Sequence, residues 1–120
     1  MSDERTIGTL NLDHEIIFTN WGHFTVLDHG VGFKLKILYV RPGAKMSMQK
    51  HRYRSEYWFV LSGKATIRYL NGKPRILEKS NFLYTPHMNW HQICNEEDEP
   101  LIIHEVQLGD CREEDVERKS

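Results

Sequence analysis

The sequence has few of the features that mark a secreted or membrane-bound protein. Of its 120 residues only Cys94 and Cys111 are cysteines, and they form no C-x-x-C pair, so neither a disulfide framework nor a thiolate metal site is indicated. No apolar run approaches the roughly 20 residues that cross a bilayer. The polar start, MSDERTIGTLNLDHE, does not resemble a signal peptide. We therefore expect a cytoplasmic protein with reduced thiols and no membrane partner.

An excess of charge of one sign is also missing. The chain has 16 Lys and Arg against 17 Asp and Glu, a formal net charge of −1. Binding to nucleic acid would need a basic stripe, so we expect no nucleic-acid partner. The length suits a single domain over residues 1–120, with a core at about 20–110, an N-terminal arm and a charged C-terminal tail.

A sustained helical period is the third absence, and strand patterns take its place. Only the tail, CREEDVERKS, is expected to form a turn of helix. Asn71-Gly72 predicts a hairpin with a type I′ turn, because both residue types tolerate positive φ. Strands are expected in FKLKILYV, EYWFVLSG, KATIRYL, ILEKSNFLYTP, NWHQICN and PLIIHEVQLG. Many short strands predict an all-β sandwich or barrel, and a small barrel can hold one ligand.

Polar side chains recur on these strands at spacings that favour a metal site. Residues two apart share a face of a strand, so we expect Gln49, His51 and Tyr53 to point the same way. Glu56 is out of phase with His51, and a turn or bulge must bring it round. With His91, these residues would offer an amide oxygen, two imidazoles and a carboxylate. Such a mixed set suits Zn, Fe, Mn, Co or Ni.

The spacing resembles the two motifs of the cupin superfamily. The first motif is G-x5-H-x-H-x4-E-x6-G, which residues 43–63 match with Gln49 in place of the first histidine. The second is G-x5-P-x-G-x2-H-x3-N, which residues 80–95 match with Ser80 and Met88 in place of glycine. The resemblance implies a cupin jelly-roll β-barrel (a double-stranded β-helix) that binds a divalent metal ion. The implied ligands are Gln49, His51, Glu56 and His91.

A narrower resemblance covers about residues 20–118. QKHRYRSEYW, YTPHMNWHQICN and PLIIHEVQLG are similar to the cupin domain of type II phosphomannose isomerases, the C-terminal part of bifunctional mannose-6-phosphate isomerase/mannose-1-phosphate guanylyltransferases. Tyr53 and Tyr57 replace two histidines of that pattern. The type I phosphomannose isomerases bind zinc through Gln, Glu and two His, so zinc is expected first, with Mn, Co, Ni or Fe as alternatives. The implied reaction is interconversion of mannose 6-phosphate and fructose 6-phosphate.

Residue roles for such an isomerase can be assigned from strand faces. Glu105 shares a strand face with Leu101, Ile103 and Gln107, so we expect it to face the barrel interior, and it is the candidate base. Lys36 is the candidate partner for substrate oxygens or phosphate. The remaining candidates for substrate binding are Tyr53, Arg54, Gln107 and Arg118.

Other interpretations remain open. The two histidines can be ordinary barrel residues, Glu56 can pair with an arginine on the surface, and Glu105 and Gln107 can lie on a solvated strand face. Lys34 and Lys36 can protect an edge strand. Two other functions compete with the isomerase: another metal-dependent cupin enzyme such as an oxygenase, and a non-catalytic sugar-binding or regulatory cupin. The family resemblance also leads us to expect a homodimer with a sugar-phosphate substrate.

Overall fold

The computed structural model describes residues 14–111 and 115–119. These residues form eleven strands and no helix, which confirms the predicted all-β fold. No segment of the described part is a helix long and apolar enough to cross a membrane. The expected N-terminal arm lies largely outside the described residues. The strands are β1 (Ile16–Phe18), β2 (Gly22–Gly30), β3 (Phe33–Val40), β4 (Met48–Lys50), β5 (Arg54–Ser62), β6 (Ala65–Arg68), β7 (Arg75–Leu77), β8 (Phe82–Thr85), β9 (Gln92–Cys94), β10 (Leu101–Gly109) and β11 (Glu117–Lys119).

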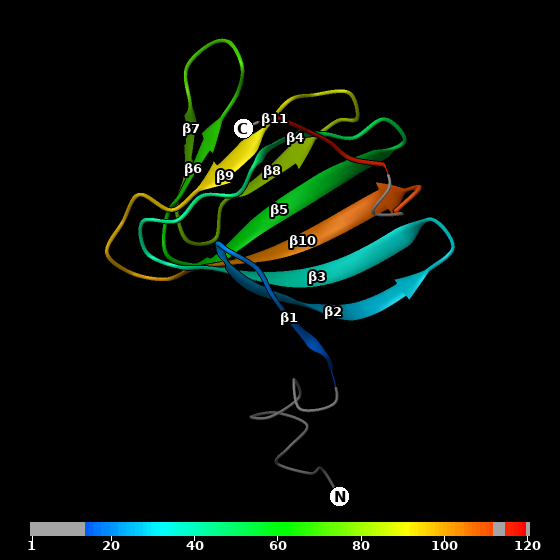
Figure 1. The fold of residues 1–120 in the computed structure, drawn as a ribbon, viewed down its shortest axis with the longest axis horizontal. Helices are drawn as coiled ribbons and strands as arrows, with labels where there is room; N and C mark the ends of the chain where they lie inside the picture. Colours follow the sequence, from blue (N-terminus) through cyan, green and yellow to red (C-terminus); the bar gives the residue numbers. More distant parts are fainter. Residues whose placement is uncertain (1–13, 112–114, 120) are drawn as a thin grey trace, which may run out of the picture.

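The strands form one large sheet that faces two small ones (Figure 1). The large sheet has the order β1-β2-β3-β10-β5-β8, and the small sheets have the orders β7-β6-β9 and β11-β4. An antiparallel bridge between Gln49 and His91 joins the two small sheets, because each residue's N–H donates to the other's carbonyl at 2.8 Å. The interior between the facing sheets is where inward side chains meet.

The barrel interior has an apolar end and a polar end. Alternate residues of β5 and β10 are buried, as strand geometry requires. At one end the core contains Leu38, Val40, Val60, Ile67, Leu101 and Ile103. At the other end β10 places Gln107 opposite Glu56 and places Glu105 between Trp58 and Lys36. Burial of the apolar half offsets the cost of enclosing these polar groups, which is tolerated only when they find partners.

The second motif departs from glycine at two positions where the backbone favours glycine. Ser80 and Met88 are the two non-glycine residues with positive φ among those described, at 75° and 66°. Asn95, which closes the motif, donates from Nδ2 to the carbonyl oxygens of Val40 and Glu99 at 3.1 and 2.7 Å. This asparagine ties the loop before β10 to the end of β3 and is structural.

Two local predictions were wrong. The β6–β7 hairpin exists, but Ile67 pairs with Arg75 across a longer loop, and Asn71 lacks the positive φ of a type I′ turn. In the tail, residues 117–119 form β11 and pair with β4 instead of forming a helical turn. Residues 112–114 lie outside the described part. In the tail, pairing with the distant strand β4 decided the backbone conformation, and local propensity did not.

Replacing Gly63 with alanine is expected to destabilise the fold by about 2–4 kcal/mol, because two penalties combine. Gly63 has φ of +87°, and an added Cβ would lie 2.5 Å from the Pro100 carbonyl oxygen. Gly72 provides the matched control, since its φ is +89° but nothing lies within 4 Å of an added Cβ. Gly72→Ala should therefore cost only about 1–2 kcal/mol. Urea unfolding of both variants measures the difference, and equal losses would contradict the proposed close approach.

Candidate metal centre

Three buried side chains from separate parts of the chain meet at the polar end of the barrel. His51 follows β4, Glu56 lies on β5 and His91 precedes β9. One potential ligand atom of each lies within 4.8 Å of the others. The Glu56 carboxylate is 3.4 Å from His51 Nε2 and 3.5 Å from His91 Nε2. Strand structure is interrupted at residues 51–53, so the inward and outward alternation of side chains starts again at β5. Glu56 therefore points into the barrel interior, as His51 does.

Both imidazole rings are oriented with Nε2 toward Glu56. His51 Nδ1 lies 3.1 Å from the Asp115 carbonyl oxygen, and His91 Nδ1 lies 2.9 Å from the Asn89 carbonyl oxygen. A carbonyl only accepts hydrogen bonds, so Nδ1 of each ring donates to it. The other ring nitrogen, Nε2, is then directed at the Glu56 carboxylate, and metal-binding histidines are oriented by the same kind of contact on their second nitrogen. Two such nitrogens and a carboxylate form a donor set that fits a divalent metal ion.

The charges at this cluster favour metal binding at neutral pH. Burial lowers the pKa of His51 below its ordinary value, so the ring is neutral. Burial alone would raise the pKa of Glu56, but the hydrogen bond from His91 and the nearby charges, Arg54 among them, bring it down to about 2. His91 and His51 contribute most to this lowering of the Glu56 pKa, and the Arg54 guanidinium adds a smaller contribution.

Arg54 lies within the cluster rather than at a phosphate site on the surface. Its Nε and Nη2 each lie 3.2 Å from Glu56 Oε2, and Nη2 is 3.3 Å from His51 Nε2. Its Nη1 is buried and has no hydrogen-bond partner in the described part of the protein. Arg54 therefore neutralises Glu56 and keeps one donor available for another group.

Gln49 completes the predicted ligand set from the neighbouring strand. Its backbone pairs with His91, and its side-chain Nε2 donates to Ser47 Oγ at 3.0 Å. The amide oxygen is thus the group left for another partner. Gln49 and Glu56 line the same small cavity, so all four predicted ligands are brought to one end of the barrel.

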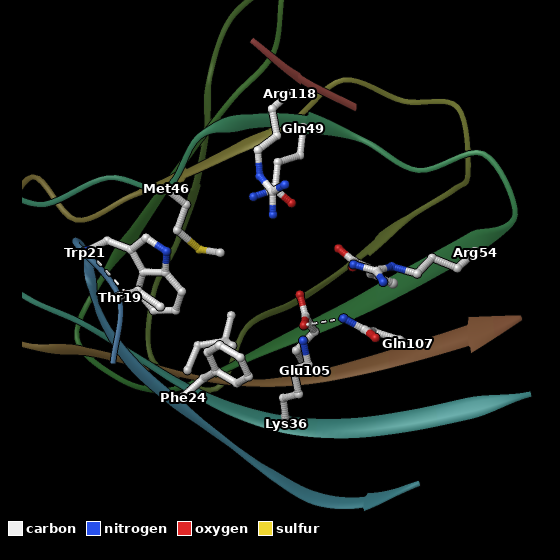
Figure 2. A pocket seen from close by; sticks show the side chains of 12 residues that line it. Thr19, Trp21, Phe24, Lys36, Met46, Gln49, Arg54, Glu105, Gln107 and Arg118 are labelled. Carbon is white, nitrogen blue, oxygen red and sulfur yellow. Dashed lines mark hydrogen bonds and ion pairs between the residues drawn. The ribbon is translucent and has the colours of Figure 1, made fainter. Parts of the chain in front are cut away.

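The cavity beside this cluster has a volume of about 110 Å³ and mixed walls. Gln49 and Arg118 project into it from one side, and Lys36 and Glu105 approach from the other (Figure 2). Trp21 and other apolar side chains close a third side. The full lining consists of Thr19, Trp21, Phe24, Lys36, Leu38, Met46, Gln49, Arg54, Glu56, Glu105, Gln107 and Arg118.

Glu105 is held rigidly in this cavity by two donors. Trp58 Nε1 donates to its Oε2 at 3.1 Å, and Gln107 Nε2 donates to its Oε1 at 2.9 Å. Burial and the nearby Glu56 charge raise the pKa of Glu105 to about 7, against the opposing effect of Lys36. Lys36 lies opposite Glu105 in the strand register, with Nζ 4.5 Å from the centre of the Phe24 ring. Burial excludes a solvated strand face for Glu105 and Gln107. It also excludes the role of an exposed edge-strand lysine for Lys36.

Tyr53 does not join the other predicted residues. It is 61% exposed and does not line the cavity, so the expectation that it shares a face with His51 was wrong. The reason is that β4 ends at Lys50, and the chain turns before β5 begins. Strand alternation therefore cannot be extended through residues 51–53. In this stretch it is Arg54 that points into the barrel. Strand alternation counted on from His51 would have placed Arg54 on the outer face.

Asp115 is a site residue that the sequence analysis missed. Its carboxylate accepts the backbone N–H groups of Arg52 at 3.0 Å and Tyr53 at 2.8 Å, and its carbonyl oxygen accepts from His51. These contacts fix the turn that carries His51. No local pattern marks Asp115, because its role depends on β11 returning to pair with β4.

Comparison with known proteins gives a consistent family assignment. Residues 8–119 match the family model described as "Mannose-6-phosphate isomerase C-terminal". The alginate biosynthesis protein AlgA of Pseudomonas aeruginosa is 36% identical over 107 residues, which are 88% of this chain and 22% of that protein. Mannose-1-phosphate guanylyltransferase 2 of Escherichia coli O157:H7 is 35% identical over 104 residues, or 87% and 21%. The chain thus spans about a fifth of the length of these relatives.

A solved structure shares the fold. It is a sugar phosphate isomerase from a cupin superfamily from Silicibacter pomeroyi, with a TM-score of 0.70 and 18% identity, covering 80% of this chain and 71% of that one. At this identity the likeness concerns the fold alone. It agrees with the cupin barrel predicted from the motif spacing.

Proposed function

Because the chain belongs to the mannose-6-phosphate isomerase C-terminal family and has the cupin fold, we propose that it is a metal-dependent sugar-phosphate isomerase. The proposed reaction interconverts mannose 6-phosphate and fructose 6-phosphate. The observation that carries the proposal is that a buried carboxylate with a pKa of about 7, Glu105, shares one cavity with Glu56 and His91 of the His51–Glu56–His91 cluster. A proton acceptor and an electrophilic centre are the two components that such an isomerisation needs.

Glu105 is suited to the proton transfer. A base works best when its pKa is near the working pH, and a value of about 7 meets that condition. In the proposed reaction Glu105 accepts the proton from carbon 2 of the aldose and returns it to carbon 1. The hydroxyl proton passes from oxygen 2 to oxygen 1, so no proton or electron is gained or lost overall. Trp58 and Gln107 keep the carboxylate aimed during both transfers.

The remaining cavity residues orient the substrate. Arg54 Nη1 and Gln107 Oε1 are buried and lack hydrogen-bond partners among residues 14–111 and 115–119. One is a donor and the other an acceptor, so together they can bind a hydroxyl or carbonyl oxygen and a hydroxyl proton of a sugar. A divalent ion held by Gln49, His51, Glu56 and His91 would supply Lewis-acid polarisation of the substrate oxygens. The Lys36 ammonium, beside Glu105, supplies a further donor to those oxygens.

Turnover of mannose 6-phosphate with added metals tests the proposal. The purified protein is stripped with chelator, and Zn, Mn, Co, Ni and Fe are then added back separately. We expect formation of fructose 6-phosphate to follow metal loading and to be absent from the stripped protein. If the protein binds stoichiometric metal but none of the five samples shows turnover, the isomerase proposal is overturned. The remaining interpretation would then be a different metal-dependent cupin enzyme.

A second candidate function, a non-catalytic sugar-binding cupin, is favoured by one contact. Arg54 Nη2 lies 3.3 Å from His51 Nε2, so the guanidinium already uses the lone pair that a metal ion would need. A protein in which Arg54 holds that position would bind a sugar phosphate without metal or turnover. The same metal measurement separates the two functions. The homodimer expected from the family resemblance stays a prediction.

A further inference from the structure

A second, wider hollow adjoins the inner cavity and is called here the outer groove. Its volume is about 530 Å³, and Trp21, Met46, Gln49 and Arg118 line both spaces. The inner cavity, at about 110 Å³, is well below the roughly 300 Å³ of ordinary small-molecule pockets. A ligand whose reacting end lies inside must therefore extend outward past Arg118.

The charged residues that line the outer groove, among those that the structure describes, are all basic. Lys45, Arg118 and Lys119 belong to its lining, and no Asp or Glu of residues 14–111 and 115–119 does. Within the described part of the chain, no carboxylate forms an ion pair with Lys45 or Arg118. By contrast Glu117, the neighbour of Arg118 on β11, pairs with Lys50 and Arg52. The described residues thus provide this groove with cations but with no anionic partner.

These cations are held in place by the fold. Arg118 lies on β11, in register with Gln49 of β4, and its guanidinium projects from that strand toward the inner cavity (Figure 2). Lys119 follows Arg118 on the same strand and points to the other face, where its Nζ lies 5.0 Å from the centre of the Trp90 ring. Lys45 forms an antiparallel bridge with Cys94. A guanidinium that lines both spaces and a lysine in the lining of the outer groove match the geometry and charge of a phosphate group.

We propose that the outer groove is a phosphomonoester subsite in which Arg118 and Lys45 bind the phosphate while the other end of the ligand enters the inner cavity. The proposal rests on the proposed function for its choice of a sugar phosphate. It adds the direction in which the substrate lies and one residue, Lys45, that the sequence patterns did not indicate. A sugar without phosphate would lack the anchor at the mouth.

Binding of mannitol 6-phosphate to the metal-loaded protein tests the subsite without turnover, because this hexitol has no carbonyl to isomerise. Calorimetric titration compares it with free mannitol and inorganic phosphate. We expect Arg118→Gln and Lys45→Met each to weaken mannitol 6-phosphate binding by about tenfold, the effect of losing one charge-assisted hydrogen bond. Arg118→Lys should restore part of the loss. The matched control, Lys79→Met, removes an exposed lysine outside the groove and should change nothing.

The outcomes separate the subsite from the isomerase. Equal affinity in all variants, or equal affinity for mannitol with and without phosphate, would overturn the subsite. Weakened binding in the groove variants, together with no turnover of mannose 6-phosphate by the unaltered protein, would leave the subsite standing and overturn the isomerase. Turnover of mannose 6-phosphate with an unchanged KM in Arg118→Gln and Lys45→Met would support the isomerase and overturn the subsite.

Discussion

Replacing Glu56 with glutamine is expected to abolish metal binding and to lower the free energy of unfolding of the metal-free protein by about 3 kcal/mol at pH 7. Glu56 is buried and contacts both histidines and Arg54. The amide would remove the charged ligand from the donor set. It would also leave the Arg54 guanidinium buried without its counter-charge, which is the costly part.

The sign of the pH dependence follows from the lowered pKa of Glu56. In the unfolded chain the carboxyl titrates near its ordinary value of 4.5, and in the folded protein near 2. Its stabilising contribution is therefore complete above pH 4.5 and is lost as the pH falls toward 2. Urea unfolding of chelator-treated protein should show this acid loss in the unaltered chain but not in Glu56→Gln.

Glu96→Gln serves as the matched control, because Glu96 is exposed and pairs with Arg68 at the surface. It should bind metal normally and change stability by less than about 1 kcal/mol. Metal retention by Glu56→Gln at the level of this control, measured by atomic spectroscopy, would remove Glu56 from the metal centre.

Replacing Glu105 with glutamine is expected to reduce kcat for mannose 6-phosphate by a factor of about 10²–10⁴ while leaving metal content unchanged. The amide is nearly the same shape and can still accept from Trp58, but it cannot take a proton. Glu78→Gln, at an exposed position away from the cavity, is the matched control and should retain full turnover. Full turnover in Glu105→Gln would remove Glu105 from the mechanism.

The free energy of unfolding of Glu105→Gln, relative to that of the unaltered protein, should rise as the pH rises. In metal-free folded protein the Glu105 carboxyl keeps its proton up to about pH 7, whereas the unfolded chain releases it near 4.5. The stability of the unaltered protein therefore falls between pH 4.5 and 7, by on the order of 3 kcal/mol for a shift of this size. Glu105→Gln lacks this titration. Its stability relative to the unaltered chain should rise across that window and level off above pH 7, as urea unfolding at pH 5 and 8 would measure.

The strands were predictable because strand geometry is local. β3 and β10 coincide with FKLKILYV and PLIIHEVQLG within a residue, and the inward face of β10 was read correctly from alternation. The spacing in the two motifs depends on the same regularity within short segments, so it located the donors of the cluster without knowledge of the fold. The two thiols are free, as the cysteine count suggested.

Predictions failed where a distant partner decides the conformation. The turn at residues 51–53 turned Tyr53 outward and Arg54 inward, and that turn is held by Asp115, more than 60 positions away. Local propensity suggested a helical turn in the tail, but β4 offered residues 117–119 backbone partners and made them a strand.

The sequence by itself determined an all-β barrel with Gln49, His51, Glu56 and His91 at cupin spacing, because alternation and short-range spacing survive in any fold that contains those strands. Only the tertiary structure decided that Arg54 lies against Glu56, that Glu105 is enclosed with it, and that Arg118 spans the inner cavity and the outer groove. These facts depend on contacts between residues far apart in the chain. The pKa of a carboxylate is set by such contacts, since burial and neighbouring charges exist only once the sheets have closed.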